Sequence, residues 1–222
     1  MKKYADYAVE KAMELLAIDS PTGYTAQAAE WVRNEFAALG YEARITRKGG
    51  VLIDLGGEDR DDALLLEAHT DTLGAMVAEI KSNGRLRLTP LGGMRAENGE
   101  TENVRVHTRS GRIIEGCYQI MNASVHVNDD YAKSERSFSG CEVVLDEDVQ
   151  SAADCRELGI EVGDIVCFDP RSRLTESGYI KSRFLDDKLS VGILLGFAKY
   201  LRDSGKTPSR HRYSLLSPTC NT

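Results

Sequence analysis

The chain has 222 residues, a net charge of −7 and 41% hydrophobic residues, a composition that suits a globular protein of one large or two modest domains. The acidic balance argues against nucleic acid as a partner, because phosphate binding requires clustered Lys and Arg. No apolar run reaches the roughly 20 residues that span a bilayer, and the first residues lack the apolar core of a signal peptide. We therefore expect a cytoplasmic protein that binds neither nucleic acid nor a membrane.

Two helices are predicted at the start of the chain. Apolar residues recur at helical spacing from Ala5 to Leu16 and again from about Thr25 to Leu39. The segment Asp19–Gly23 separates them, because its Pro disfavours a helix and its Gly frees the backbone. Gly40 is well placed to end the second helix.

Strands follow the two helices. Residues 41–46 alternate, residues 51–55 form a short apolar run, and Ala63–His69 is almost continuously apolar. Such a run is typical of a strand buried on both faces of a sheet in an α/β protein.

The texture changes after about residue 73, where many short strands are punctuated by Gly until about residue 170. This pattern favours a small β-barrel or β-sandwich. Helical periodicity returns from Asp187 to Leu201, and Tyr213–Leu216 has the pattern of a further strand. We therefore predict an α/β domain formed by residues 1–73 and 172–222, split by a β-rich insertion at residues 74–171.

His69 and Asp71 are the strongest chemical signal, because they stand where an apolar strand ends. Ligands gather at the carboxyl ends of strands in open α/β sheets, and residues two apart on a strand project to the same side. Imidazole binds zinc or cobalt, and a nearby carboxylate can bind the metal or orient the ring. A simple hydrogen bond between the two side chains is the alternative.

Asp186 and Asp187 form the second signal, at the start of the helix predicted from residue 187. Carboxylates are favoured at a helix N-terminus, and Asp186 is suited to capping it. The functional alternative is a carboxylate that bridges two metal ions roughly 3.5–4 Å apart.

The remaining candidates are weaker. His211 lies in a short basic segment that we expect to be solvated, and His107 and His126 fall in the β-rich section without a motif. The cysteines contain no C-x-x-C pair, which favours free thiols in a reducing compartment. They are Cys117, Cys141, Cys155, Cys167 and Cys220.

Five stretches in this order resemble the tetrahedral aminopeptidases, a family of cytoplasmic dinuclear metallopeptidases that includes glutamyl and deblocking enzymes. They are Ser20–Gly23, Ala68–Gly74, Leu91–Gly93, Glu157–Asp164 and Phe184–Lys188. The resemblance implies a zinc-exopeptidase-like α/β/α sandwich, here incomplete at its C-terminal side, with an inserted PDZ-like β-barrel that mediates dimerisation.

The same resemblance implies the roles of the site residues. His69 would bind one metal ion, Asp186 would bridge two, and Asp71 would support the His69 imidazole as a catalytic residue. The ions would be Zn or Co, the substrates would be peptides cleaved at the N-terminus, and the chain would form homo-oligomers from dimers to dodecamers.

Two positions depart from the family pattern. Thr72 stands where the family often has Glu, and residues 217–222 stand where it places a Glu-Glu pair for proton transfer and metal binding. We therefore expect a truncated or frameshifted enzyme that is inactive in this form. The alternatives are a non-catalytic assembly protein that keeps the dimerisation domain, and a related metal-dependent amidohydrolase or deacetylase.

Overall fold

The computed structural model describes residues 1–219 and divides the chain into two compact units. One unit comprises Met1–Thr72 together with the chain from Pro170 onward, and the other comprises Leu73–Asp169. Cys220, one of the expected free thiols, lies outside the described residues. No helix in the described part of the chain is both long and apolar enough to cross a bilayer.

The first unit is an α/β layer pair, with helices and a four-stranded sheet of order β1-β2-β12-β3. β12 pairs antiparallel with β2 and parallel with β3, so β12 and β3 end at the same edge of the sheet. The main elements are α1 (Lys2–Leu16), α2 (Ala26–Ala38), β1 (Glu42–Ile45), β2 (Val51–Gly56), β3 (Asp59–His69), α4 (Leu185–Ser204) and β12 (Arg210–Ser217).

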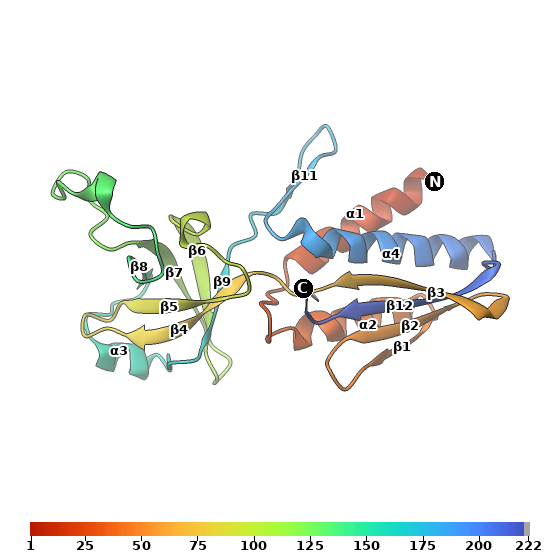
Figure 1. Cartoon of the computed structure of the whole chain (residues 1–222), viewed down its shortest axis with the longest axis horizontal. Coiled ribbons are helices and arrows are strands. Elements are labelled where there is room, and N and C mark those ends of the chain that lie inside the picture. Colours follow the sequence, from red (N-terminus) through yellow and green to blue (C-terminus); the bar gives the residue numbers. More distant parts are fainter. Residues whose placement is uncertain (220–222) are drawn as a thin grey trace. The chain divides into compact units, whose positions relative to one another are not determined.

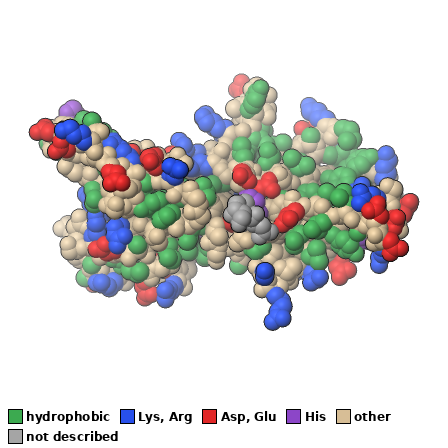
Figure 2. Space-filling view, in the orientation of Figure 1, with side chains coloured by type: hydrophobic (Ala, Val, Ile, Leu, Met, Phe, Trp, Pro, Cys, Tyr) green, Lys and Arg blue, Asp and Glu red, His purple; other side chains and the backbone are tan. Residues whose placement is uncertain are grey.

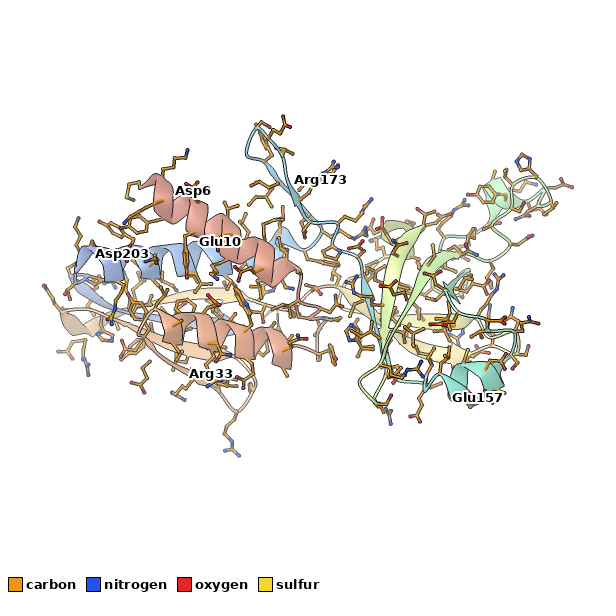
Figure 3. The ribbon with its side chains drawn as sticks, turned by 180° about the vertical axis from the view of Figure 1, so that it is seen from behind. Asp6, Glu10, Arg33, Glu157, Arg173 and Asp203 are labelled. Carbon is orange, nitrogen blue, oxygen red and sulfur yellow. The ribbon has the colours of Figure 1, made fainter. Side chains whose placement is uncertain are left out.

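The helices pack on one face of this sheet. Leu15, Phe36, Ile53 and Leu195 are fully buried in one cluster drawn from α1, α2, β2 and α4. Seen from behind, α1 and α2 stand in front, with α4 next to α1 (Figure 3). Among the described residues, two layers of the expected sandwich are thus present.

The expectation that Ala63–His69 is buried on both faces is wrong. β3 is the edge strand of the described sheet, and most of its side chains are exposed, with Leu65 52% exposed. An apolar run alone does not show how many layers cover it, which explains the error.

The predicted end of the second helix is confirmed. Gly40 has a φ of +84°, its N–H donates to the Ala37 carbonyl, and the Tyr41 N–H donates to the Phe36 carbonyl. These two bonds form a Schellman motif, which needs a residue in the left-handed conformation that Gly adopts at little cost.

The helices α1 and α4 approach each other closely through small residues. A Cβ added to Gly192 would lie 2.7 Å from the Cβ of Ala12, and one added to Gly196 would lie 2.8 Å from the Cβ of Ala8. On their outer side the two helices form an apolar groove of about 510 Å³, whose lining includes Tyr4 and Ile193. Apolar side chains gather over these helices in Figure 2.

The second unit is a closed barrel with strand order β4-β5-β8-β7-β6-β9, which resolves the choice between barrel and sandwich (Figure 1). Pairing of β4 with β9 closes it. A short helix, α3 (Ala152–Glu157), begins with a capping box formed by Ser151 and Asp154. The strands are β4 (Gly74–Ile80), β5 (Leu86–Leu91), β6 (Glu102–His107), β7 (Ile113–Ile120), β8 (Cys141–Leu145) and β9 (Ile165–Phe168).

Thiols of the barrel unit form no disulfide, as expected, and three of the four are buried. Burial raises the pKa of Cys141 and Cys155 above the ordinary value, which keeps them as neutral thiols at neutral pH. Within the described residues, the cysteines outside disulfides are Cys117, Cys141, Cys155 and Cys167.

Candidate metal site

His69 ends β3, the edge strand that lies parallel to β12, and its register partner is Ser217 near the end of β12. The Thr70 N–H donates to the Ser217 carbonyl at 3.0 Å, so the two strands stay paired up to the point where both end. The candidate site therefore lies at the carboxyl ends of two parallel strands, where α/β folds commonly bind ligands.

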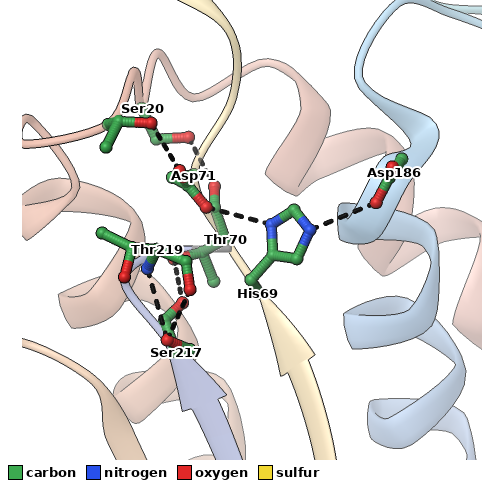
Figure 4. A network of polar contacts seen from close by, with 8 residues as sticks. Ser20, His69, Thr70, Asp71, Asp186, Ser217 and Thr219 are labelled. Atoms are coloured by element: carbon green, nitrogen blue, oxygen red, sulfur yellow. Dashed lines mark hydrogen bonds and ion pairs between the residues drawn. The ribbon is translucent and has the colours of Figure 1, made fainter. Parts of the chain in front are cut away.

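His69 contacts one carboxylate with each ring nitrogen (Figure 4). Its Nε2 lies 3.1 Å from Oδ1 of Asp186, and its Nδ1 lies 3.0 Å from Oδ1 of Asp71. The contact with Asp71 is close but poorly aligned for a hydrogen bond, since both of these buried atoms lack a well-formed one in the described structure. The structure thus brings together all three residues predicted from the sequence.

The two carboxylates have opposite environments. The Asp71 side chain is 7% exposed, whereas that of Asp186 is 93% exposed. A buried carboxylate on Nδ1 suits orientation of the ring. An exposed carboxylate opposite Nε2 is free to bind a ligand from solvent.

Asp71 is held by the segment between α1 and α2. The Thr22 hydroxyl donates to Oδ2 of Asp71 at 2.5 Å, and the fully buried Ser20 donates to the Thr70 carbonyl at 2.8 Å. A bridge between Pro21 and Thr72 adds backbone hydrogen bonds on either side. Ser20–Gly23, one of the stretches that carried the family resemblance, therefore positions the carboxylate behind His69.

Asp186 lies at an irregular start of α4. The helix begins at Leu185, but Asp186 and Asp187 have non-helical backbone angles and are joined by a cis peptide bond. The Asp186 carboxylate contacts Nε2 of His69 at 3.1 Å.

Lys188 is a positioning residue that the sequence did not reveal. Its side chain is buried, and Nζ donates to the carbonyls of Leu15 and Ile18 at 3.0 and 2.6 Å. It thereby ties the start of α4, which carries Asp186, to the segment that holds Asp71. A Lys near a helix start gives no sequence signal of burial, because Lys is almost always exposed.

Replacing Lys188 with Met is expected to lower the free energy of unfolding of this unit by about 2–4 kcal/mol, because two buried carbonyls lose their donor. Urea unfolding followed by the fluorescence of Trp31, the only tryptophan, measures the change in this unit. Lys199→Met is the matched control, since Lys199 pairs with Asp203 at the surface and should contribute less than about 1 kcal/mol. Equal losses in the two variants would show that Lys188 has no special role.

His211 is buried rather than solvated, so the expectation for it is wrong. It lies in β12, its Nε2 is 2.8 Å from Oδ1 of Asp54, and its ring packs on Tyr213. The basic neighbours Arg210 and Arg212 suggested a loop, but they alternate with His211 along a strand.

Solved aminopeptidases share this arrangement of an α/β unit interrupted by a barrel. Aminopeptidase APDkam598 from the archaeon Desulfurococcus kamchatkensis superimposes with a TM-score of 0.82 at 22% sequence identity, covering 96% of this chain and 56% of that one. The TET1 peptidase of Pyrococcus horikoshii, which can assemble into a tetrahedron or a large octahedral shell, gives a TM-score of 0.77 at 22% identity, covering 94% and 60%.

Residues 49–213 match the model of the family described as M42 glutamyl aminopeptidase, and the chain belongs to this family. A relative from Bacillus subtilis (strain 168), named "Putative aminopeptidase YhfE", is 44% identical over 84% of this chain and 54% of its own length. The chain thus spans about half the length of the curated relative that it matches.

Proposed function

We propose that this chain is a portion of a cytoplasmic, metal-dependent aminopeptidase. It supplies one imidazole and one shared carboxylate to a pair of divalent ions, Zn or Co. In this form the chain does not cleave peptides. The observation that carries the proposal is the 3.1 Å separation of His69 Nε2 and Asp186 Oδ1. These residues are 117 positions apart in the chain.

The two donor atoms fit a metal ion. Ligand atoms at 2.0–2.2 Å from a tetrahedral zinc ion lie about 3.4 Å from each other. The observed separation of 3.1 Å is close to this value. Because the Asp186 side chain is 93% exposed, its second oxygen is open to a second ion, as a bridging carboxylate requires.

The contacts of His69 suit this role. If a metal ion replaced the hydrogen bond between Nε2 and Asp186, the Asp71 carboxylate 3.0 Å from Nδ1 would favour a proton on Nδ1 and leave the lone pair of Nε2 for the ion. Thr22 in turn fixes the Asp71 carboxylate. When bound, a divalent ion in such a site lowers the pKa of water and polarises a carbonyl group.

Among the described residues, the ligand set around His69 is incomplete. A catalytic zinc ion usually has three protein ligands. In the described part of the chain, however, no group of three His, Cys, Asp or Glu ligand atoms includes His69. The proposal therefore includes weak metal binding and no turnover by this chain.

A non-catalytic assembly protein is the second candidate, and the incomplete ligand set favours it. The barrel unit would then mediate dimerisation, in keeping with the multimeric assembly of the Pyrococcus TET1 peptidase. A related amidohydrolase would use the same ligands on other amides, and a panel of aminoacyl-anilides and acetylated amines would separate these activities in a complete enzyme.

Zinc is expected to protect His69 from diethyl pyrocarbonate, which modifies neutral imidazole nitrogens, because the metal occupies Nε2. Peptide mapping by mass spectrometry with and without millimolar Zn²⁺ measures the modification of each histidine. His126, exposed in the barrel unit, is the internal control and should react equally in both samples. Unchanged labelling of His69, in a sample that light scattering shows to be oligomeric, would favour the assembly protein.

A further inference from the structure

A basic arm precedes the candidate metal site in the first unit. β10 (Arg173–Leu174) and β11 (Ile180–Lys181) form a two-stranded antiparallel ribbon that projects from the sheet and helices of its own unit (Figure 1). The Arg183 N–H donates to the Pro170 carbonyl at 2.8 Å and closes the base of the arm.

The arm encloses a pocket of about 420 Å³ whose lining is basic. Four of its seven lining residues are positively charged and none is acidic, within a chain whose net charge is −7. The lining residues are Pro170, Arg171, Ser172, Arg173, Lys181, Ser182 and Arg183. Arg171 and Arg183 make further polar interactions, so the case for a ligand depends on Arg173 and Lys181.

The positive charges of the arm lower its own stability. Arg173 and Lys181 are direct register partners, and like charges that face each other across a ribbon are destabilising. A ribbon of two short strands is also only marginally stable. Arg171 has a φ of +50°, a conformation that costs energy for a residue with a side chain. An anion bound in the pocket would offset the repulsion between Arg173 and Lys181.

The chemistry of the lining favours a carboxylate. Guanidinium groups bind carboxylates through two parallel hydrogen bonds, and the Lys ammonium adds a point charge. The hydroxyls of Ser172 and Ser182 lie 2.7 Å apart on the same lining and add neutral hydrogen-bonding groups. Arg173 extends from the arm in Figure 3, away from the packed core.

The pocket is close to the candidate metal site along the chain. Arg183 precedes Asp186 by three residues, a stretch that spans at most about 11 Å when fully extended. A peptide whose N-terminus lies at His69 and Asp186 covers a similar distance with its next two or three residues. We propose, on the basis of the proposed function, that the arm binds a carboxylate two or three residues from the N-terminus of a peptide substrate, so that short acidic peptides are the preferred class.

The test compares an acidic and a neutral tripeptide, Ala-Glu-Glu and Ala-Gln-Gln-amide, by NMR titration of the ¹⁵N-labelled chain without metal. We expect the acidic peptide to bind about tenfold more tightly, the size of effect that one charge-assisted hydrogen bond can give. The double substitution Arg173→Gln/Lys181→Gln should remove most of this difference. The matched control is Arg47→Gln/Lys48→Gln, which removes the same charge from the exposed turn between β1 and β2 of the same unit and should preserve it.

Substitutions in the metal site distinguish the peptide-binding proposal for the arm from the proposed metal-binding function. His69→Ala and Asp186→Asn should keep the preference for the acidic peptide even though they weaken metal binding, so that either proposal can fail alone. Equal affinity for both peptides, or equal loss in the arm and control variants, would overturn the inference. Inorganic phosphate that displaces the peptide at the same concentration would show a general anion site and would also overturn the assignment to peptides.

Discussion

Gly192→Ala is expected to destabilise the first unit by about 1–2 kcal/mol, and Gly192→Val by about 3 kcal/mol or more. In an open helix the Ala variant would gain about 1 kcal/mol, because Ala has a higher helix propensity than Gly. Here the new Cβ would lie 2.7 Å from both the Ala12 Cβ and the Ala8 carbonyl oxygen. Overpacking against backbone typically costs 1–3 kcal/mol and outweighs the gain in propensity.

The sign of the Ala result therefore tests the contact between α1 and α4. Urea unfolding monitored by Trp31 fluorescence reports on the unit that contains both helices. Ile193→Ala, at the neighbouring position, is the control and should cost less than about 1 kcal/mol, since Ile193 is 56% exposed. A Gly192→Ala variant more stable than the wild type would show that the helices are not in close contact.

Much of the fold follows from local pattern. Periodic apolar residues placed α1 and α2, and Gly40 marked the end of α2 because only a left-handed residue completes its C-terminal motif. Local pattern left a barrel and a sandwich open, because closure depends on pairing between β4 and β9, which are distant in sequence, and only the family resemblance implied the barrel. The ribbon of the basic arm was missed because two-residue strands with charged partners have no hydrophobic period.

The candidate site was predictable in part. His69 and Asp71 were found from their place at a strand end, and Asp186 from its place at a helix start. The contact between Asp186 and His69 depends on packing of elements 117 positions apart, which the sequence does not display. Burial of Lys188 and His211 was missed for the same reason, since each depends on partners far away in the chain.

The second large effect concerns metal affinity at His69 and Asp186. Complete structural zinc sites with four ligands bind with about 10–16 kcal/mol. If ligands contribute equally, two of them supply about 5–8 kcal/mol, which corresponds to a Kd between about 1 µM and 0.2 mM. His69→Ala and Asp186→Asn should each weaken binding at least about tenfold, because a single remaining ligand cannot chelate an ion.

A control histidine separates this site from unspecific binding. His126→Ala removes an exposed imidazole of the barrel unit and should leave the affinity of the His69 site unchanged. Circular dichroism and Trp31 fluorescence of each variant would show whether the fold is retained. A loss common to all three variants would point to scattered surface binding.

Isothermal titration of the chain with Zn²⁺ and Co²⁺ is the most direct test of the central claim, that the His69 imidazole and the Asp186 carboxylate form one metal-binding site. The account predicts binding in the micromolar to submillimolar range that either substitution removes. Wild-type affinity in both the His69→Ala and the Asp186→Asn variant would contradict it.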